Sequence, residues 1–214
     1  MRFLLSAVCF WTIVFGAGAV VPAEHAPREI AGYRLGTPVS VYGDRLNSEN
    51  TFTVRLRPYL KEAPVSVPEG FDSGYVVYGQ CDAPGTILRI KVKYEDDRRA
   101  FFDRLLDALK KKYGAPKEYV GDPFQAYVAW KWTFGASGNE KITMIVSHYD
   151  GDDEEHTQGN ALKLTLTSQI AKESQCYEAQ RQKQALKERP ETARGAAKRA
   201  IPEGDLWGRF LPVP

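Results

Sequence analysis

The sequence is poor in the residue types that most often build chemical sites. Its 214 residues include 3 cysteines, 3 histidines and 2 methionines. It contains no G-x-S-x-G nucleophile motif, no H-E-x-x-H zinc motif, no phosphate-binding glycine loop and no dinucleotide fingerprint. Neither sign of charge dominates, since the formal net charge is +2. We therefore assign no catalytic, cofactor-binding or metal-binding residues, and we expect no cofactor and no nucleic-acid partner.

One stretch alone is apolar enough to enter a membrane, and it lies at the start of the chain. Met1-Arg2 precedes an uncharged, mostly apolar run over 3–21, which ends in small residues and Pro22. A positive charge, an apolar segment and small residues are typical of a secretory signal peptide. The run is also close to the length of about 20 residues that spans a bilayer, so a retained anchor is the alternative. We favour cleavage and predict a signal peptide over 1–23 and a periplasmic or secreted mature protein.

Cleavage would leave two cysteines, Cys81 and Cys176. In an oxidising compartment an even pair predicts a disulfide, and two buried free thiols are the alternative. A bridge between them would close a loop of about 95 residues, for which the chain-entropy model gives a stabilisation of roughly 4–5 kcal/mol. The spacing excludes a C-x-x-C redox motif.

Hydrophobic periodicity divides the rest of the chain into strands and helices. In 86–94, Leu88, Ile90 and Val92 form an apolar face, and the basic residues between them point to water. In 98–113 an apolar stripe recurs at helical spacing, and Gly114 follows as a stop signal. The predicted strands span 30–36, 51–57, 74–79, 86–94, 127–134, 141–149 and 161–167; a short helix spans 38–46, a loop spans 58–72, and a final helix begins near Ser168.

Runs of adjacent strands interrupted by helices predict the fold class and the domain organisation. We expect an α+β fold: a mostly antiparallel sheet, with one main amphipathic helix and a C-terminal helix packed on one face. The predicted domain spans 24–186. The tail, 187–214, is expected to be basic and disordered because its composition turns to Gln, Lys, Arg and Ala.

Three local patterns could build a site, and each has a structural alternative. The acidic run 150–156 offers oxygen ligands but lacks the D-x-D-x-D-G spacing of a calcium loop, so a solvated hairpin tip is favoured. Trp130 and Trp132 share one strand face and could stack on sugars, but core packing is favoured. His148 and His156 could act as general bases. His148 is in register with apolar residues of its strand, which favours a hydrogen-bonded histidine at the end of a core face.

Three segments resemble a group of uncharacterised exported bacterial proteins. They are 32–36 (GYRLG), 121–124 (GDPF) followed by 129–132 (AWKW), and 161–167 (ALKLTLT). The resemblance spans about residues 30–178. It implies export and a single domain, and it implies no activity.

Export and the lack of catalytic motifs favour a non-catalytic envelope protein. It would bind a protein partner or an anionic envelope polymer, and the solvent face of the sheet and the basic tail are the expected contact surfaces. Membrane contact would be peripheral at most, through the tail. An alternative for the tail is a solubilising segment without a target. The alternative function is an exported hydrolase whose Asp, Glu and His residues are scattered along the chain.

Overall fold

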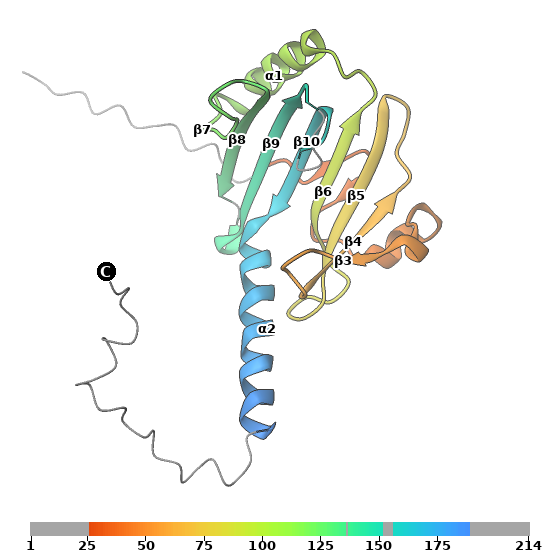
Figure 1. Ribbon diagram of the computed structural model, residues 1–214, viewed down its shortest axis with the longest axis vertical. Helices are drawn as coiled ribbons and strands as arrows, with labels where there is room; N and C mark the ends of the chain where they lie inside the picture. Colours follow the sequence, from red (N-terminus) through yellow and green to blue (C-terminus); the bar gives the residue numbers. More distant parts are fainter. Residues whose placement is uncertain (1–25, 136, 152–155, 189–214) are drawn as a thin grey trace, which may run out of the picture.

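The computed structural model describes residues 26–135, 137–151 and 156–188 (Figure 1). The predicted signal peptide lies outside these residues, as does all of the predicted tail beyond residue 188. Eight strands form one antiparallel sheet in the order β3-β4-β5-β6-β10-β9-β8-β7, so the predicted α+β class is confirmed. The strands are β3 (Phe52–Thr53), β4 (Leu60–Val65), β5 (Phe71–Gly79), β6 (Ile87–Tyr94), β7 (Glu118–Tyr119), β8 (Tyr127–Gly135), β9 (Lys141–Tyr149) and β10 (Gly159–Leu166).

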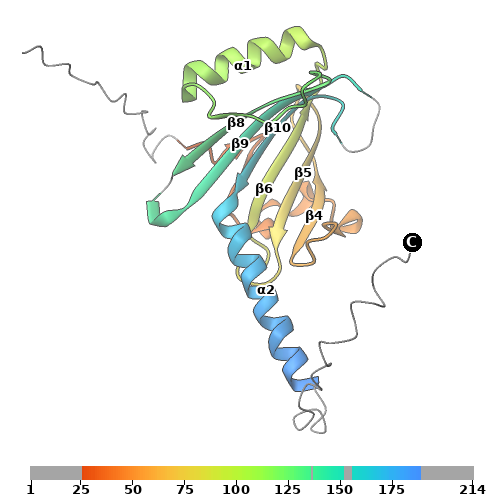
Figure 2. The ribbon, with the colours of Figure 1, turned by 60° about the vertical axis from the view of Figure 1, so that its left-hand side comes forward.

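The remaining elements surround this sheet. A small hairpin, β1 (Glu29–Ile30) and β2 (Tyr33–Arg34), opens the described chain. Helix α1 (Arg99–Tyr113) lies across one end of β8–β10, and α2 (Thr167–Glu188) continues from β10 away from the sheet (Figures 1 and 2). Within the described part of the chain, no helix has the length and apolar character to cross a membrane. Among the residues that the structure describes, there are also three short 3₁₀ helices, at Val39–Arg45, Ser48–Asn50 and Ser137–Asn139.

The sheet has two chemically different faces because side chains alternate along each strand. The first, which we call the core face, carries the apolar residues of β6 and β8–β10 and is packed against α1 and the β1–β2 region. The second, the polar face, is turned toward the reader in Figure 1, and no described helix crosses it. On β6, β10, β9 and β8 the polar face includes Arg89, Lys91 and Lys93 (β6), Ala161, Lys163 and Thr165 (β10), Thr143, Ile145 and Ser147 (β9), and Tyr127, Ala129, Lys131 and Thr133 (β8).

Helix α1 follows the predicted pattern closely. Phe102, Leu106 and Leu109 are buried against the core face, while the intervening charged residues are exposed. The helix ends at Gly114, whose φ of 79° favours glycine. The carbonyl of Gly114 also accepts a hydrogen bond of 2.8 Å from Trp132 Nε1, so the end of α1 is fixed to the core face.

Two predictions between residues 51 and 72 are wrong. The predicted strand 51–57 is reduced to β3, because the chain turns at Leu56, which has a φ of 61° and is 91 % exposed. The predicted loop 58–72 contains β4, although Pro64 lies within it. Strand β3 pairs with β4 only at Lys61 and Glu62. At Pro64 the outer edge of β4 faces Asn47, whose backbone N–H donates to the Pro64 carbonyl oxygen (3.0 Å), so this contact uses the acceptor of the proline and does not need the donor it lacks.

The disulfide and one buried carboxylate tie α2 to the turn between β5 and β6. The Sγ atoms of Cys81 and Cys176 are bonded. One turn earlier in α2, the fully buried Glu173 accepts hydrogen bonds from three backbone amides of this turn. They are the amides of Gln80 (3.0 Å), Cys81 (2.7 Å) and Ala83 (2.6 Å). A charged acceptor thus satisfies donors that burial would otherwise leave unpaired.

We expect Glu173→Ala to lower the free energy of unfolding by about 3 kcal/mol, because it removes the acceptor of three amide donors. Urea denaturation with the disulfide intact measures this loss. Glu173→Gln retains one carbonyl acceptor and should lose less. The control is Glu178→Ala, an exposed position on the same helix, which should change stability by less than about 0.5 kcal/mol. Equal losses for Glu173→Ala and Glu178→Ala would contradict this role of Glu173.

Candidate functional site

The register of the sheet brings basic side chains from distant parts of the sequence together on the polar face. Lys91 of β6 lies directly opposite Lys163 of β10, and Arg89 lies opposite Thr165. We call Arg89, Lys91 and Lys163 the cation cluster. Neighbouring strands lie about 4.8 Å apart, and like charges placed directly opposite each other destabilise a sheet. The fold therefore maintains an arrangement that is electrostatically unfavourable.

Partial burial adds to this cost. Burial, and then the charges of Arg89, Lys91 and Arg57, lower the pKa of Lys163 to about 8. Burial is also the main cause that lowers the pKa of Lys91 and the pKa of Arg89, and in both cases the charge of Glu62 opposes the shift. All three members of the cluster are thus held where positive charge is disfavoured.

Within the described residues, no carboxylate forms an ion pair with the cation cluster at 4.0 Å or less. Two flanking lysines do have such partners. Lys93 Nζ lies 3.3 Å from Asp72 Oδ2, and Lys131 Nζ lies 2.8 Å from Glu118 Oε2. The members of the cluster therefore differ from their lysine neighbours on the same face.

One nitrogen atom of Arg89 also lacks a hydrogen-bond partner among the described residues. Its Nε atom is buried and has no hydrogen-bond partner in the described structure. Glu62 shares its row across the sheet, two strands away through Val77. Burial raises the pKa of Glu62 above the usual value for glutamate, although Lys91 and Arg89 oppose this effect. Glu62 is thus itself disfavoured as an anion and does not complete an ion pair with Arg89.

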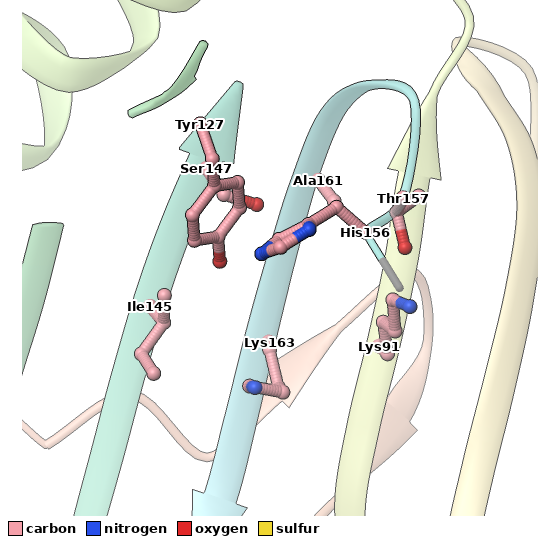
Figure 3. Close-up of a pocket in the computed structure, with 8 residues that line it drawn as sticks. All are labelled: Lys91, Tyr127, Ile145, Ser147, His156, Thr157, Ala161 and Lys163. Atoms are coloured by element: carbon pink, nitrogen blue, oxygen red, sulfur yellow. The ribbon is translucent and has the colours of Figure 1, made fainter. Parts of the chain in front are cut away.

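A small depression opens beside the two lysines (Figure 3). Its volume is about 100 Å³, and its lining, as far as the structure describes it, includes no carboxylate. In Figure 3 the side chain of Lys163 leans toward β9 and that of Lys91 leans the other way. Pockets that enclose a whole small molecule usually measure roughly 300–1,000 Å³, so this depression has room for one group of a larger ligand. It is lined by Lys91, Tyr127, Ile145, Ser147, His156, Thr157, Ala161 and Lys163.

The two histidines considered as general bases lie on opposite faces of the sheet. His156 lines the depression, and its ring centroid is 4.2 Å from that of Tyr127. His148 is buried on the core face, where its ring contacts Phe102. The Nδ1 atom of His148 lies 2.8 Å from Oδ1 of Asn160. Since an amide oxygen only accepts, Nδ1 carries the proton, and His148 is the hydrogen-bonded core histidine that its strand position predicts.

The Asn160 side chain connects this histidine to the start of α1. Its Nδ2 atom donates to the carbonyl oxygens of Asp96 (2.7 Å) and Arg98 (3.0 Å). The His148–Asn160 pair therefore positions the segment from which the helix begins. No site can use His148 and His156 together, which removes one form of the hydrolase hypothesis.

Of the other sequence candidates, His148 and Asp150 line a second depression of about 260 Å³ beside Asp97 and Arg98. Trp132 is 2 % exposed and Trp130 packs against Tyr119 and the core, so core packing of this pair is confirmed. Of the acidic run 150–156, residues 152–155 lie outside the described structure. Among the residues that are described, no cluster of three or more His, Cys, Asp or Glu side chains could hold a metal ion.

Comparison of the chain with protein-family models, with curated proteins and with solved structures finds no match. The chemistry of the site therefore follows from its own geometry. Ammonium and guanidinium groups next to hydroxyl groups form strong, charge-assisted hydrogen bonds to carboxylate, sulfate or phosphate oxygens. The arrangement can hold an anion, and none of the described lining residues is a carboxylate that could act as a general acid or base.

Two of the three members of the cation cluster can be placed from the sequence. The alternation in 86–94 places Arg89 and Lys91 on the solvent side of a strand, as the structure confirms. Lys163 was not singled out, although it alternates with Leu162 and Leu164 in the same way. The missing information is the pairing of β6 with β10. The environment of a lysine on one strand depends on the residue opposite it on the next strand, here Lys91 opposite Lys163.

We expect Lys163→Met to raise the free energy of unfolding at pH 7 by about 1 kcal/mol, because it removes a charge that the folded state disfavours. A shift of one pKa unit corresponds to about 1.4 kcal/mol, and the partial exposure of Lys163 to solvent screens most of the full shift. The folded-state pKa of Lys163, about 8, is below that of an ordinary lysine. Between the two values the unfolded state binds more protons, so wild-type stability should rise from pH 8 to 9.5.

Urea denaturation across this pH range measures both effects. Lys163→Met should reduce the rise, and Lys172→Met, an exposed position on α2, should leave it unchanged. A destabilised Lys163→Met variant with the wild-type pH dependence would show that Lys163 is an ordinary structural lysine.

Proposed function

We propose that this chain is an exported, non-catalytic binding protein that holds an anionic group of an envelope polymer or protein partner on its polar face. The observation that carries the proposal is the cation cluster. Arg89, Lys91 and Lys163 are half-buried, mutually repulsive and without a described carboxylate at ion-pair distance. Export is supported by the N-terminal sequence and agrees with the disulfide between Cys81 and Cys176.

An anionic ligand would relieve each of the unfavourable features of the site. It would reduce the repulsion between Lys91 and Lys163, and it would favour the charged form of Lys163. Oxygen atoms of the ligand would also find a hydroxyl donor at Thr157, which lines the same depression. Functional sites commonly reduce stability in this way, because ligand-binding groups lack favourable partners in the absence of the ligand.

Binding agrees better with the lining of the site than hydrolysis does. A hydrolase needs a nucleophile or water activated by a base that is itself positioned. Ser147 is only 8 % exposed, and its hydroxyl interacts with that of Tyr127. The described residues of the lining include no carboxylate. The basic groups of the cation cluster, in contrast, can bind an anion directly.

Sulfate is a suitable probe because its charge stays constant above pH 7. We expect it to bind the full chain, with its disulfide intact, with a dissociation constant that rises about fivefold or more between pH 7 and 9.5, because Lys163 loses its proton near pH 8. The charged or titratable groups that face Lys163 are Lys91 and Arg89 from β6, Arg57, Tyr127 from β8 and His156. NMR chemical-shift titration reports both the affinity and the residues affected.

Lys163→Gln should weaken sulfate binding at pH 7 and abolish most of its pH dependence. Lys111→Gln, on the exposed side of α1, is the matched control and should bind like wild type. If sulfate shifts no resonance of β6 or β10 at millimolar concentration, the proposal is wrong. Turnover of a generic ester or glycoside substrate that Ser147→Ala abolishes would favour the hydrolase instead.

A further inference from the structure

We infer that the ligand is a linear acidic polysaccharide that crosses the strands along a row of three lysines. This inference rests on the proposed anion site and adds the shape and class of the ligand. It starts from the register of the central sheet. Lys91 lies opposite Lys163, Lys163 opposite Ile145, and Ile145 opposite Lys131. These residues form one straight row on the polar face, perpendicular to the strands, which we call the lysine row.

The spacing of the lysine row fits a ligand with repeated charges. Strands lie about 4.8 Å apart, so the first two lysines are one spacing apart, and Lys131 lies about 10 Å beyond Lys163. The depression beside Lys163 has a volume of about 100 Å³ and admits a single group. A ligand that uses Lys131 as well must therefore extend along the open face and carry a second anion.

The surroundings of the lysine row fit sugar rings between the anions. Ile145 offers an apolar patch between Lys163 and Lys131, which suits the C–H face of a sugar ring. The next row of the same face carries Thr143 and Thr133, which are paired with each other across β9 and β8. Both threonines are half-buried, and their hydroxyls can donate to and accept from sugar hydroxyls.

The same features disfavour a single-stranded nucleic acid. Proteins that bind single strands combine basic residues with aromatic side chains on which successive bases stack. Between Lys163 and Lys131 the row offers Ile145 instead of an aromatic ring, and the one aromatic residue in register with the row, Tyr75, lies opposite Lys91 on β5, outside the span from Lys91 to Lys131. The formal net charge of +2 also lacks the strong basic bias of such proteins.

Glu118 marks the end of the row and competes with the ligand there. It lies opposite Lys131 and forms an ion pair of 2.8 Å with it. Exposed pairs of this kind are weak, so an anion of the polymer can replace Glu118. Removing this carboxylate should therefore strengthen the binding of a long ligand and leave a short one unaffected.

Oligogalacturonides, which carry one carboxylate per sugar, are the probes of choice. We expect the hexasaccharide to bind the full, disulfide-bonded chain at least tenfold more tightly than the disaccharide, because only the longer chain reaches Lys131. The methyl-esterified hexasaccharide has the same shape without the charges and should not bind. Isothermal titration calorimetry at pH 7 and low salt compares the three ligands.

Two variants locate the far end of the ligand. Lys131→Gln should weaken hexasaccharide binding about fivefold, the typical contribution of one basic residue near an anionic surface, and should leave disaccharide binding unchanged. Glu118→Gln should strengthen hexasaccharide binding alone. Lys111→Gln on α1 serves again as the matched control, and thermal unfolding of each variant verifies that it is folded.

The outcomes separate this inference from the proposed function. If sulfate and the disaccharide bind but chain length and Lys131→Gln have no effect, the anion site stands and the polysaccharide track is wrong. If neither sulfate nor any charged oligosaccharide binds, both proposals fail. Tighter binding of an oligothymidylate than of the hexasaccharide, lost in Lys163→Gln, would identify a nucleic-acid ligand and overturn the inference.

Discussion

The pairing of β6 with β10 is the constraint on which the rest of the structure depends. It joins the first half of the sheet, β3–β6, to the second half, β7–β10. Its register places Val92 against Leu162 on the core face and Lys91 against Lys163 on the polar face. A slip of one residue would exchange the two faces of β10 and turn Lys163 toward the core. Core formation and the cation cluster are thus two results of the same register.

Several interactions hold this junction although the cluster opposes it. The apolar pairs of the core face supply the main stabilisation by burial. Directly after β10 the chain enters α2, where Glu173 and the disulfide bind the turn that precedes β6. The Glu173 hydrogen bonds and the disulfide thus lie at one end of the β6–β10 pair. The depression lies on the polar face of the same two strands. The fold can therefore tolerate repelling cations at a position that its core and its covalent link stabilise.

The sequence predicts this fold well where one pattern is strong and poorly where pairing decides. Phe102, Leu106 and Leu109 specify α1, and His148 is recognisable as a core-face residue from its own strand. In contrast, β3 and β4 were misassigned, because Pro64 is permitted only by the place of β4 near the edge of the sheet. The candidate site falls between these cases. The alternation within β6 predicts which of its residues are exposed. Its neighbour in the sheet, β10, is the last strand of the chain, and a single sequence does not reveal which residues of β6 and β10 lie opposite each other.

We propose that Lys163 is held in an unfavourable environment that a bound anion relieves. The titration of the Lys163 side chain measures this, followed through its ¹³Cε resonance with and without a saturating acidic oligosaccharide. We expect a midpoint near 8 in the free protein, well below the usual value for lysine, and a higher midpoint when the ligand is present. A Lys163 that titrates with the ordinary lysines near pH 10.4, and does not respond to the ligand, would contradict this proposal.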